Sequence, residues 1–281
     1  MRRKLIAASL TLLFAATTAM FAQRYGGGGG GRRYSGNPNN RWAQYEAEMQ
    51  DPIDDPAGAW DKTEFAFGRL RYRSERDRRG WYGRARWGID ANKSDRLFIQ
   101  SLKRLTRVDV RSVEQIVDID SDELFDWPWL YAVGIGDWVL SDAQAARLRQ
   151  YFERGGFFMV DDFHNEYEWA SFMEGMAKVI PNPRVIDLPD DAPIFHTVYD
   201  LSQRVRPPGL NVVHGDQIER NGVTPHWRAV IDSKDRVVVA ICFNMDLGDA
   251  WEWADLPEYP EKYSSMAFRM GVNYVIYAMT H

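Results

Sequence analysis

The side chains best suited to chemistry follow one apolar segment near the middle of the chain. Asp161, Asp162 and His164 come directly after the apolar residues 157–160. Adjacent carboxylates at the end of a buried strand can bind a divalent metal, or keep one carboxyl protonated for acid/base catalysis. We interpret Asp162 and His164 as candidate catalytic residues, with Asp161 in support. The structural alternative is that Asp161 caps the next helix and Asp162 pairs with an arginine.

A second polar group follows the apolar residues 129–133. Gly134, Gly136 and Asp137 form a turn there, and glycines without side chains could let a ligand approach the backbone. A lone Gly-x-Gly is weak evidence for such a site, and it is more typical of a tight turn. These three residues are therefore secondary candidates for ligand binding.

A third group follows the apolar residues 237–243. Asn244 and Asp246 stand at the end of this segment, and they would share one cleft with Asp162 if the two strands are neighbours. The chain's single cysteine, Cys242, lies inside the same segment. A cysteine in such a run is most often an inert core residue, and it has no partner for an internal disulfide.

The remaining polar motifs are weaker. Residues 118, 120 and 122 alternate as Asp-x-Asp-x-Asp, but the glycine and distal glutamate of a calcium loop are missing, which favours a solvated acidic connection. The histidines His164, His196, His214 and His226 lack metal-binding spacing, although His214-Gly215-Asp216 could supply ligands in three dimensions. The chain has no Gly-x-Ser-x-Gly, which disfavours a serine hydrolase.

Tryptophan is heavily used, with 11 residues. Trp81, Trp87, Trp251 and Trp253 could form aromatic platforms for a glycan, or they could cover the mouth of the sheet as packing. Residues 71–86 are rich in arginine and aromatic side chains. Because the net charge is -5, we interpret them as a solvated face or a protein contact, and we expect no nucleic-acid partner.

The elements that position these groups alternate between strand and helix. Ser141 and Gln144 have the spacing of a capping box, and Gly155-Gly156 is a typical helix stop. A strand over 129–133, this capped helix and a strand over 157–160 form a βαβ crossover, which predicts parallel neighbours.

The same reading predicts the other elements. We expect a first strand within 65–72, a helix over 95–105 capped by Ser94, one or two strands within 108–119, a helix over 166–178, an extended segment over 184–188, a hairpin of 229–231 and 237–243, and a last helix with an apolar stripe of Phe268, Val272, Val275, Ile276 and Met279. The sum is an α/β fold, an open, mostly parallel sheet with helices on both faces.

The N-terminal region precedes the folded part. Arg2, Arg3 and Lys4 precede the apolar residues 5–18, and Ala22 ends a plausible cleavage site, so residues 1–22 read as a signal peptide. An uncleaved anchor is the alternative. Residues 23–60, with an unbroken glycine run at 26–31, read as a flexible linker, and 61–281 as one domain. We expect an exported protein, periplasmic or extracellular, with no integral membrane segment after cleavage.

Several segments together resemble one bacterial family. They are 67–72 (FGRLRY), 127–131 (WPWLY) with Gly134, 148–151 (LRQY) running into 155–157 (GGF) and 161–162 (DD), and finally 273–274 (NY) with 277–278 (YA). The chain from about residue 61 onward resembles domain of unknown function 4159. That family is similar to the flavodoxin-like fold of class I glutamine amidotransferases.

The resemblance also has functional implications. An amidotransferase needs a nucleophilic cysteine on the turn after the strand, but residues 134–138 read GIGDW, without one. Family members often lie beside genes for AAA-type ATPases and von Willebrand factor A-type membrane proteins, which implies an envelope-associated assembly. We therefore expect a catalytically degenerate binding or assembly module with an envelope protein partner. The alternative is a metal-assisted or acid/base hydrolase of envelope or extracellular glycans. No motif implies a particular cofactor, and a divalent metal would suit the carboxylates.

Overall fold

The computed structural model describes residues 55–56, 58–75, 86–215 and 224–281. The predicted signal peptide and most of the predicted linker lie outside this part of the chain. The described elements belong to one structural unit, Asn40–His281. In chain order they are β1 (Gly68–Arg71), β2 (Arg73–Ser74), η1 (Arg86–Gly88), α4 (Lys93–Leu105), β3 (Gln115–Asp118), η2 (Asp122–Asp126), β4 (Trp129–Val133), η3 (Ile135–Asp137), β5 (Trp138–Val139), α5 (Asp142–Glu153), β6 (Phe157–Phe163), α6 (Asn165–Val179), β7 (Arg184–Asp187), η4 (Pro193–Phe195), α7 (Leu210–Val213), β8 (His226–Ile231), β9 (Val237–Phe243), α8 (Leu247–Glu252) and α9 (Glu261–Thr280).

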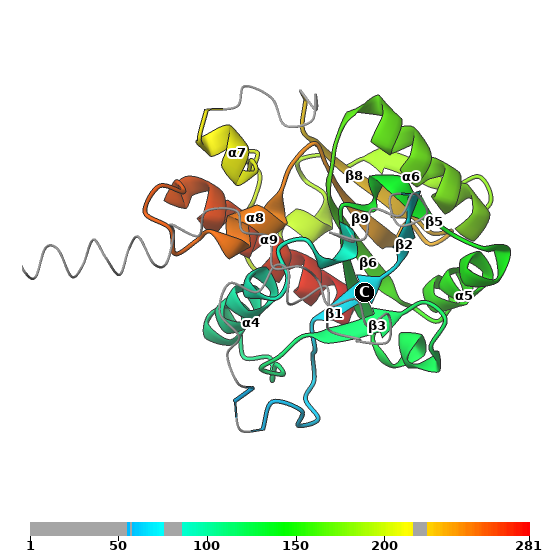
Figure 1. Ribbon diagram of the computed structural model, residues 1–281, viewed down its shortest axis with the longest axis horizontal. Coiled ribbons are helices and arrows are strands. Elements are labelled where there is room, and N and C mark those ends of the chain that lie inside the picture. Colours follow the sequence, from blue (N-terminus) through cyan, green and yellow to red (C-terminus); the bar gives the residue numbers. More distant parts are fainter. Residues whose placement is uncertain (1–54, 57, 76–85, 216–223) are drawn as a thin grey trace, which may run out of the picture. The chain divides into compact units, whose positions relative to one another are not determined.

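The main sheet has seven strands in the order β3-β1-β4-β6-β9-β8-β7 (Figure 1). The first five run parallel, and β8 and β7 add an antiparallel hairpin edge. Counted along the chain, the five parallel strands lie in the order 2-1-3-4-5, which is the doubly wound, flavodoxin-like order. The predicted open, mostly parallel α/β sheet is confirmed.

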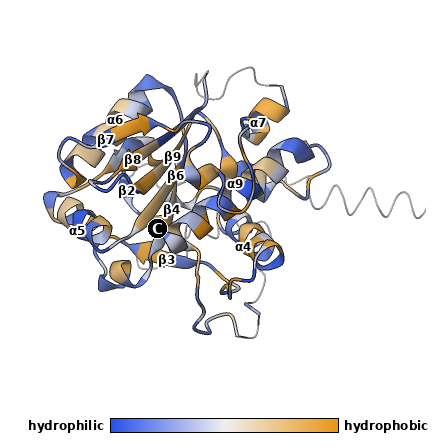
Figure 2. Cartoon of the chain, turned by 180° about the vertical axis from the view of Figure 1, so that it is seen from behind, coloured by the Kyte–Doolittle hydropathy of each residue, from blue (hydrophilic) through white to orange (hydrophobic). Residues whose placement is uncertain are grey.

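Successive residues of β4 point to opposite faces, because side chains alternate along a strand. Trp129, Tyr131 and Val133 join the core that lies beneath α4, α8 and α9. Leu130 and Ala132 join the core beneath α5 and α6. In Figure 2 the central strands carry mostly hydrophobic residues, whereas the helices around them mix hydrophobic and hydrophilic ones. The helices therefore cover both faces, as a parallel sheet requires.

The crossover from β4 to β6 forms as predicted. Ser141 Oγ accepts the N–H of Gln144 at 3.2 Å, and Gln144 Oε1 accepts the N–H of Ser141 at 3.1 Å, which completes the capping box. Gly155 follows the helix with a φ of 98°, a conformation that favours glycine. The parallel pairing then places Val133 opposite Asp161.

Two local predictions are wrong in detail. Ser94 does not cap α4, because Asn92 precedes the helix and the Ser94 hydroxyl accepts a hydrogen bond from the buried Arg69 at 3.2 Å. In α9, Val272 and Val275 are buried, but Met279 is 42% exposed and Phe268 and Ile276 are only half-buried.

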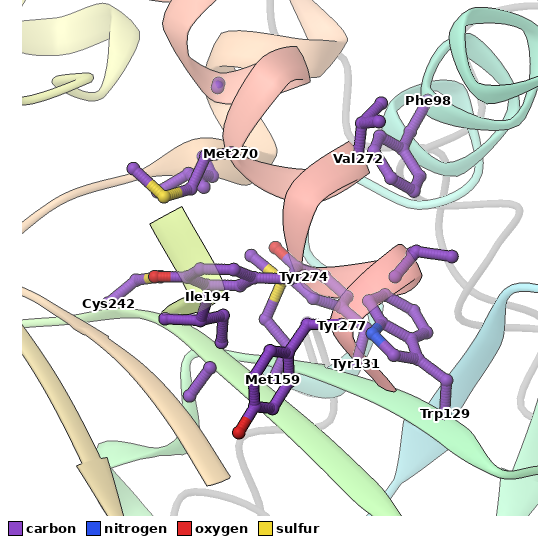
Figure 3. Close-up of a cluster of buried hydrophobic side chains, with 14 of the residues drawn as sticks. Phe98, Trp129, Tyr131, Met159, Ile194, Cys242, Met270, Val272, Tyr274 and Tyr277 are labelled. Atoms are coloured by element: carbon purple, nitrogen blue, oxygen red, sulfur yellow. The ribbon is translucent and has the colours of Figure 1, made fainter. Parts of the chain in front are cut away.

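The buried face of α9 instead uses aromatic and small residues. Figure 3 shows Met270 and Tyr274 of this helix in one buried cluster with Tyr131 and Met159 of the sheet. Gly271 allows close approach, since a Cβ there would lie 2.4 Å from the Phe98 ring. An aliphatic stripe alone therefore does not mark the packed face. Of the helices in the described ranges, none is both long and apolar enough to span a membrane.

Candidate functional site

The three predicted polar groups meet at the carboxyl edge of the sheet. The N–H of Gly134, after β4, donates to the Asp161 carbonyl at 2.9 Å. The N–H of Asn244, after β9, donates to the Phe163 carbonyl at 3.1 Å. Strands β4, β6 and β9 thus end side by side; the sequence predicted this for β4 and β6 and left it open for β9. Ligands of open α/β sheets bind at such an edge, and the predicted site residues lie along it.

Backbone conformation is unusual along this edge. Of the six described residues other than glycine with φ between 52° and 66°, a region that such residues seldom adopt, four lie along this edge: Asp90, Asp162, Asn165 and Asn244. Each such conformation costs on the order of 1 kcal/mol and persists only where the surroundings enforce it. Strain of this kind concentrates at functional sites and at tightly determined turns, so it marks this edge for closer inspection.

Asp162 and His164 contact each other inside the protein. His164 Nε2 lies 3.2 Å from Asp162 Oδ1, and both residues are buried. The backbone N–H of His164 donates to Glu168 Oε2 at 2.8 Å. The first turn of α6 is held by Asn165, whose Oδ1 accepts the N–H groups of Tyr167 and Glu168. The two predicted catalytic residues are therefore adjacent and buried.

An ion-pair network occupies the turn after β4. Arg86 Nη1 donates to Glu168 Oε1 at 2.8 Å, and Arg86 Nε lies 3.7 Å from Asp137 Oδ1. A Cβ at Gly136 would lie 2.4 Å from Glu168 Cβ, and a Cβ at Gly134 would lie 3.0 Å from Arg86 Nε. The glycines therefore make room for Arg86 and Glu168 rather than for a ligand against the backbone. Gly134 is left-handed, with φ at 63°, as a tight turn requires.

Asp161 is a helix cap, but for a different helix than predicted. Its Oδ2 accepts the N–H groups of Leu247 and Gly248 at 2.8 and 2.9 Å, at the start of α8, and the Tyr131 hydroxyl at 3.1 Å. Its Oδ1 is buried and has no hydrogen-bond partner within the described residues. Burial, and then the neighbouring Asp162, raise the pKa of Asp161 to about 8. Asp161 is thus an acid that holds its proton near neutral pH.

The other strand-end candidates also act locally. Asp246 Oδ1 accepts the N–H of Asp249 at 2.7 Å and caps α8, while Asn244 bridges two loops through Asn165 and the Thr224 carbonyl. Cys242 is fully buried, and burial raises the pKa of its thiol well above the usual value. Figure 3 shows this cysteine among the core side chains. The prediction of an inert core cysteine agrees with this environment.

Of the two predicted uses of the tryptophans, packing fits the described residues and glycan stacking does not. Trp87 and Trp251 are buried in the two cores, so they cannot stack on a glycan. Trp253 is half-buried and donates its Nε1–H to Asp249 Oδ1 at 3.0 Å. Trp81 lies outside the described residues. Counting tryptophans could not separate packing from ligand stacking, because both uses select the same side chain.

The acidic alternation and the isolated histidines are surface features. Asp118 forms a two-point ion pair with Arg71, Asp122 pairs with Arg147 at 3.0 Å, and Asp120 accepts from Gln144. These contacts agree with a solvated connection. His196 and His226 are partly exposed beside surface aspartates, and His214 ends α7. Asp216, of the His214 motif, lies outside the described residues.

The sequence reasoning missed one acidic group. Asp90, Asp249 and Glu252 each place one carboxylate oxygen within 4.8 Å of the other two. Burial, then Asp249 and Glu252, raise the pKa of Asp90 well above its usual value. The one sequence signal was Asp249 and Glu252, which lie three residues apart on a helix that follows a strand end. Asp90 joins them only through the tertiary fold.

Fold and site together define an open, doubly wound α/β domain with a buried acidic group at its carboxyl edge. The chain belongs to the family described as Domain of unknown function (DUF4159), which it matches over residues 66–279. No curated protein matches the chain. The family prediction is therefore confirmed, whereas the likeness to amidotransferases stays a prediction.

Proposed function

We propose that this chain is an exported binding or assembly module built on a catalytically degenerate domain. The observation that carries this proposal is the enclosure of Asp162 and His164. The two side chains contact each other, both are buried, and the backbone of His164 is bonded to Glu168, which itself pairs with Arg86. A catalytic acid and base must reach a substrate, whereas a structural pair need not.

The turn after β4 supports the same proposal. Acyl transfer by an amidotransferase-like domain would need a nucleophile there with a base within hydrogen-bond reach. The turn instead carries Gly134 and Gly136, and the space beside them is filled by Arg86 and Glu168. The single cysteine of the chain lies within β9, in the core.

A partner contact is proposed for the first turn of α6, next to this enclosed pair. Tyr167 is 72% exposed there, although its neighbour Glu168 is buried. Exposed aromatic side chains are enriched at protein interfaces, since they bury a large area with few rotatable bonds. An envelope protein is the proposed partner, because residues 1–22 have the pattern of an export signal.

Photo-crosslinking in intact cells tests the proposal. A benzophenone amino acid would replace Tyr167 in the full-length chain, and a matched variant would carry it at Met279, which is also exposed but lies near the end of α9. The control position is at the other end of the strands from Tyr167. His281, two residues after Met279, lines a groove of about 780 Å³ with Gly155 and Val238, at the amino-terminal ends of β6 and β9. We expect a discrete envelope-protein adduct from position 167 and none from position 279. Equal adducts from both, or none from either, would contradict the proposal.

A second candidate function is a metal-assisted or acid/base hydrolase of envelope glycans. The observation that favours it is Asp161, since a carboxyl with a pKa of about 8 has the proton that a general acid needs near neutral pH. Asp161 is fully buried, so this function would also require the strand edge to open to a substrate. A panel of peptidoglycan fragments and ester substrates, assayed with wild type and Asp161→Asn, distinguishes the two. Turnover that is lost in the variant would favour the hydrolase and replace the module.

A further inference from the structure

Three carboxyl groups from two separate segments meet beside the carboxyl edge. Asp249 and Glu252 lie one turn apart on α8, and Asp90 lies between η1 and α4. One oxygen of each lies within 4.8 Å of the other two. Asp90 and Glu252 are buried, and Asp249 is half-buried. Three acids held this close repel each other unless protons or a cation compensate their charge.

A buried arginine fixes the backbone that leads to Asp90. Arg69 of β1 is fully buried and donates its Nη1–H groups to the carbonyls of Trp87 and Ile89, at 3.0 and 2.9 Å. It also pairs with Asp95 through both Nε and Nη2. This arginine fixes the segment that leads to Asp90, which adopts a φ of 62°. The carboxylate is therefore held in place rather than free to swing into solvent.

The Asp90 carboxylate has an oxygen without a partner. Asp90 is 5% exposed, and its Oδ2 has no hydrogen bond to any part of the chain that the structure describes. An unsatisfied buried acceptor costs about 1–3 kcal/mol, and more when it is charged. A cation bound within the acidic cluster would satisfy this oxygen.

Gly248 leaves the room that this oxygen needs. A Cβ at position 248 would lie 2.3 Å from Asp90 Oδ2, so any other residue would displace the carboxylate. The Asp249 side chain is in turn oriented by two donors, because Oδ1 accepts the Trp253 Nε1–H at 3.0 Å and Oδ2 accepts the Leu210 N–H at 2.7 Å. Metal-binding carboxylates are usually oriented by hydrogen bonds of this kind.

We propose that Asp90, Asp249 and Glu252 bind one divalent cation, and that Ca²⁺ is the best fit. The three ligands are carboxylates, which suit hard cations rather than Zn²⁺ or Cu²⁺. Two oxygens bound to one Ca²⁺ lie at most about 5 Å apart, whereas Mg²⁺ holds its ligands closer, within about 4.2 Å. The three oxygens lie within 4.8 Å of one another, which is inside the reach of one Ca²⁺. This site is distinct from Asp162 and His164, and it does not depend on the module proposal.

Calcium titration of the mature protein tests this inference. The protein would be treated with chelator, dialysed, and titrated with Ca²⁺ in a calorimeter at neutral pH. Terbium, which replaces Ca²⁺ at oxygen sites, gives a second readout, because Trp253 bonds to Asp249 and can sensitise its luminescence. We expect one ion per chain, with Mg²⁺ binding more weakly. Asp90→Asn and Glu252→Gln should each weaken binding by about tenfold or more.

A matched control separates a site from a diffuse acidic field. Asp255 lies just beyond α8, is exposed, and pairs with Lys93 at 2.8 Å, so Asp255→Asn should leave the affinity unchanged. Circular dichroism would confirm that each variant folds. If Asp90→Asn does not fold, the test uses Glu252→Gln alone. The absence of heat and of terbium luminescence in wild type would overturn the inference, as would an equal loss of affinity in Asp255→Asn. Binding without an adduct at Tyr167 would leave the cation site standing and remove the module proposal.

Discussion

The Asp161 carboxylate accepts the Gly248 N–H at 2.9 Å, so the acid at the end of β6 caps the helix that follows β9. The same oxygen accepts the Leu247 N–H, which satisfies two of the free donors at the start of α8. Gly248 in turn leaves space for Asp90 Oδ2. The contact between Asp161 and Gly248 therefore connects the predicted site after β4 and β6 with the acidic group of Asp90, Asp249 and Glu252, which the sequence analysis missed.

The Asp161 carboxyl should make stability depend on pH. Its folded pKa of about 8 lies above the value of about 3.9 expected in the unfolded chain, so between these values the folded state binds the extra proton. Stability from this group is complete below about pH 4 and is lost as pH rises through 8, by up to about 1.4 kcal/mol per pH unit. Urea unfolding in chelator should show a steeper decline from pH 5 to 8 in wild type than in Asp161→Asn. Identical slopes would show that Asp161 titrates normally.

Glu168 should contribute far more to stability than an exposed glutamate of the same helix. Glu168→Gln weakens the buried pair with Arg86 and should lower the free energy of unfolding by about 2–4 kcal/mol. Glu174→Gln is the matched control, because its pair with Lys178 is exposed and should contribute less than about 0.5 kcal/mol. Denaturant midpoints measure both. Equal effects would mean that the Arg86 network is not structural.

Gly248→Ala should disturb both sites that meet at α8. The added methyl group would lie 2.3 Å from Asp90 Oδ2 and 2.8 Å from the Tyr131 hydroxyl, so one of them must move. We expect a loss of about 1–3 kcal/mol in stability and a loss of Ca²⁺ binding of about tenfold or more. Unfolding curves and calcium titration of the same preparation check this. Unchanged calcium affinity would separate Gly248 from the proposed cation site.

Cys242 should be unreactive in the native protein. It is fully buried in β9, and its raised thiol pKa disfavours the reactive thiolate. A thiol reagent such as dithionitrobenzoate should label one cysteine per chain in denaturant and almost none in native buffer over the same time. Rapid native labelling would show that the β9 core opens readily and that this thiol is available for chemistry.

Most of the frame was predictable because local signals agreed with one another. The capping residues Ser141 and Gln144, the glycine stop at Gly155 and the apolar runs on either side sufficed for the β4–α5–β6 unit. The meeting of strand ends at one edge followed from parallel topology. The site was harder, because Asp90 reaches Asp249 and Glu252 only through the tertiary fold. Likewise, the Ser94 hydroxyl accepts a hydrogen bond from Arg69 of β1 and does not cap α4, and this contact could not be read from the local sequence.

The enclosure of His164 is the central claim, and chemical modification of histidines tests it most directly. Diethylpyrocarbonate labelling of the native protein, read by peptide mass spectrometry, compares His164 with His196 and His226, whose side chains are 33% and 31% exposed. His164 is fully buried, so we predict that it stays unlabelled while the other two react. Labelling of His164 at the rate of His226 would mean that a reagent, and so a substrate, reaches the Asp162–His164 pair, and the module proposal would fail.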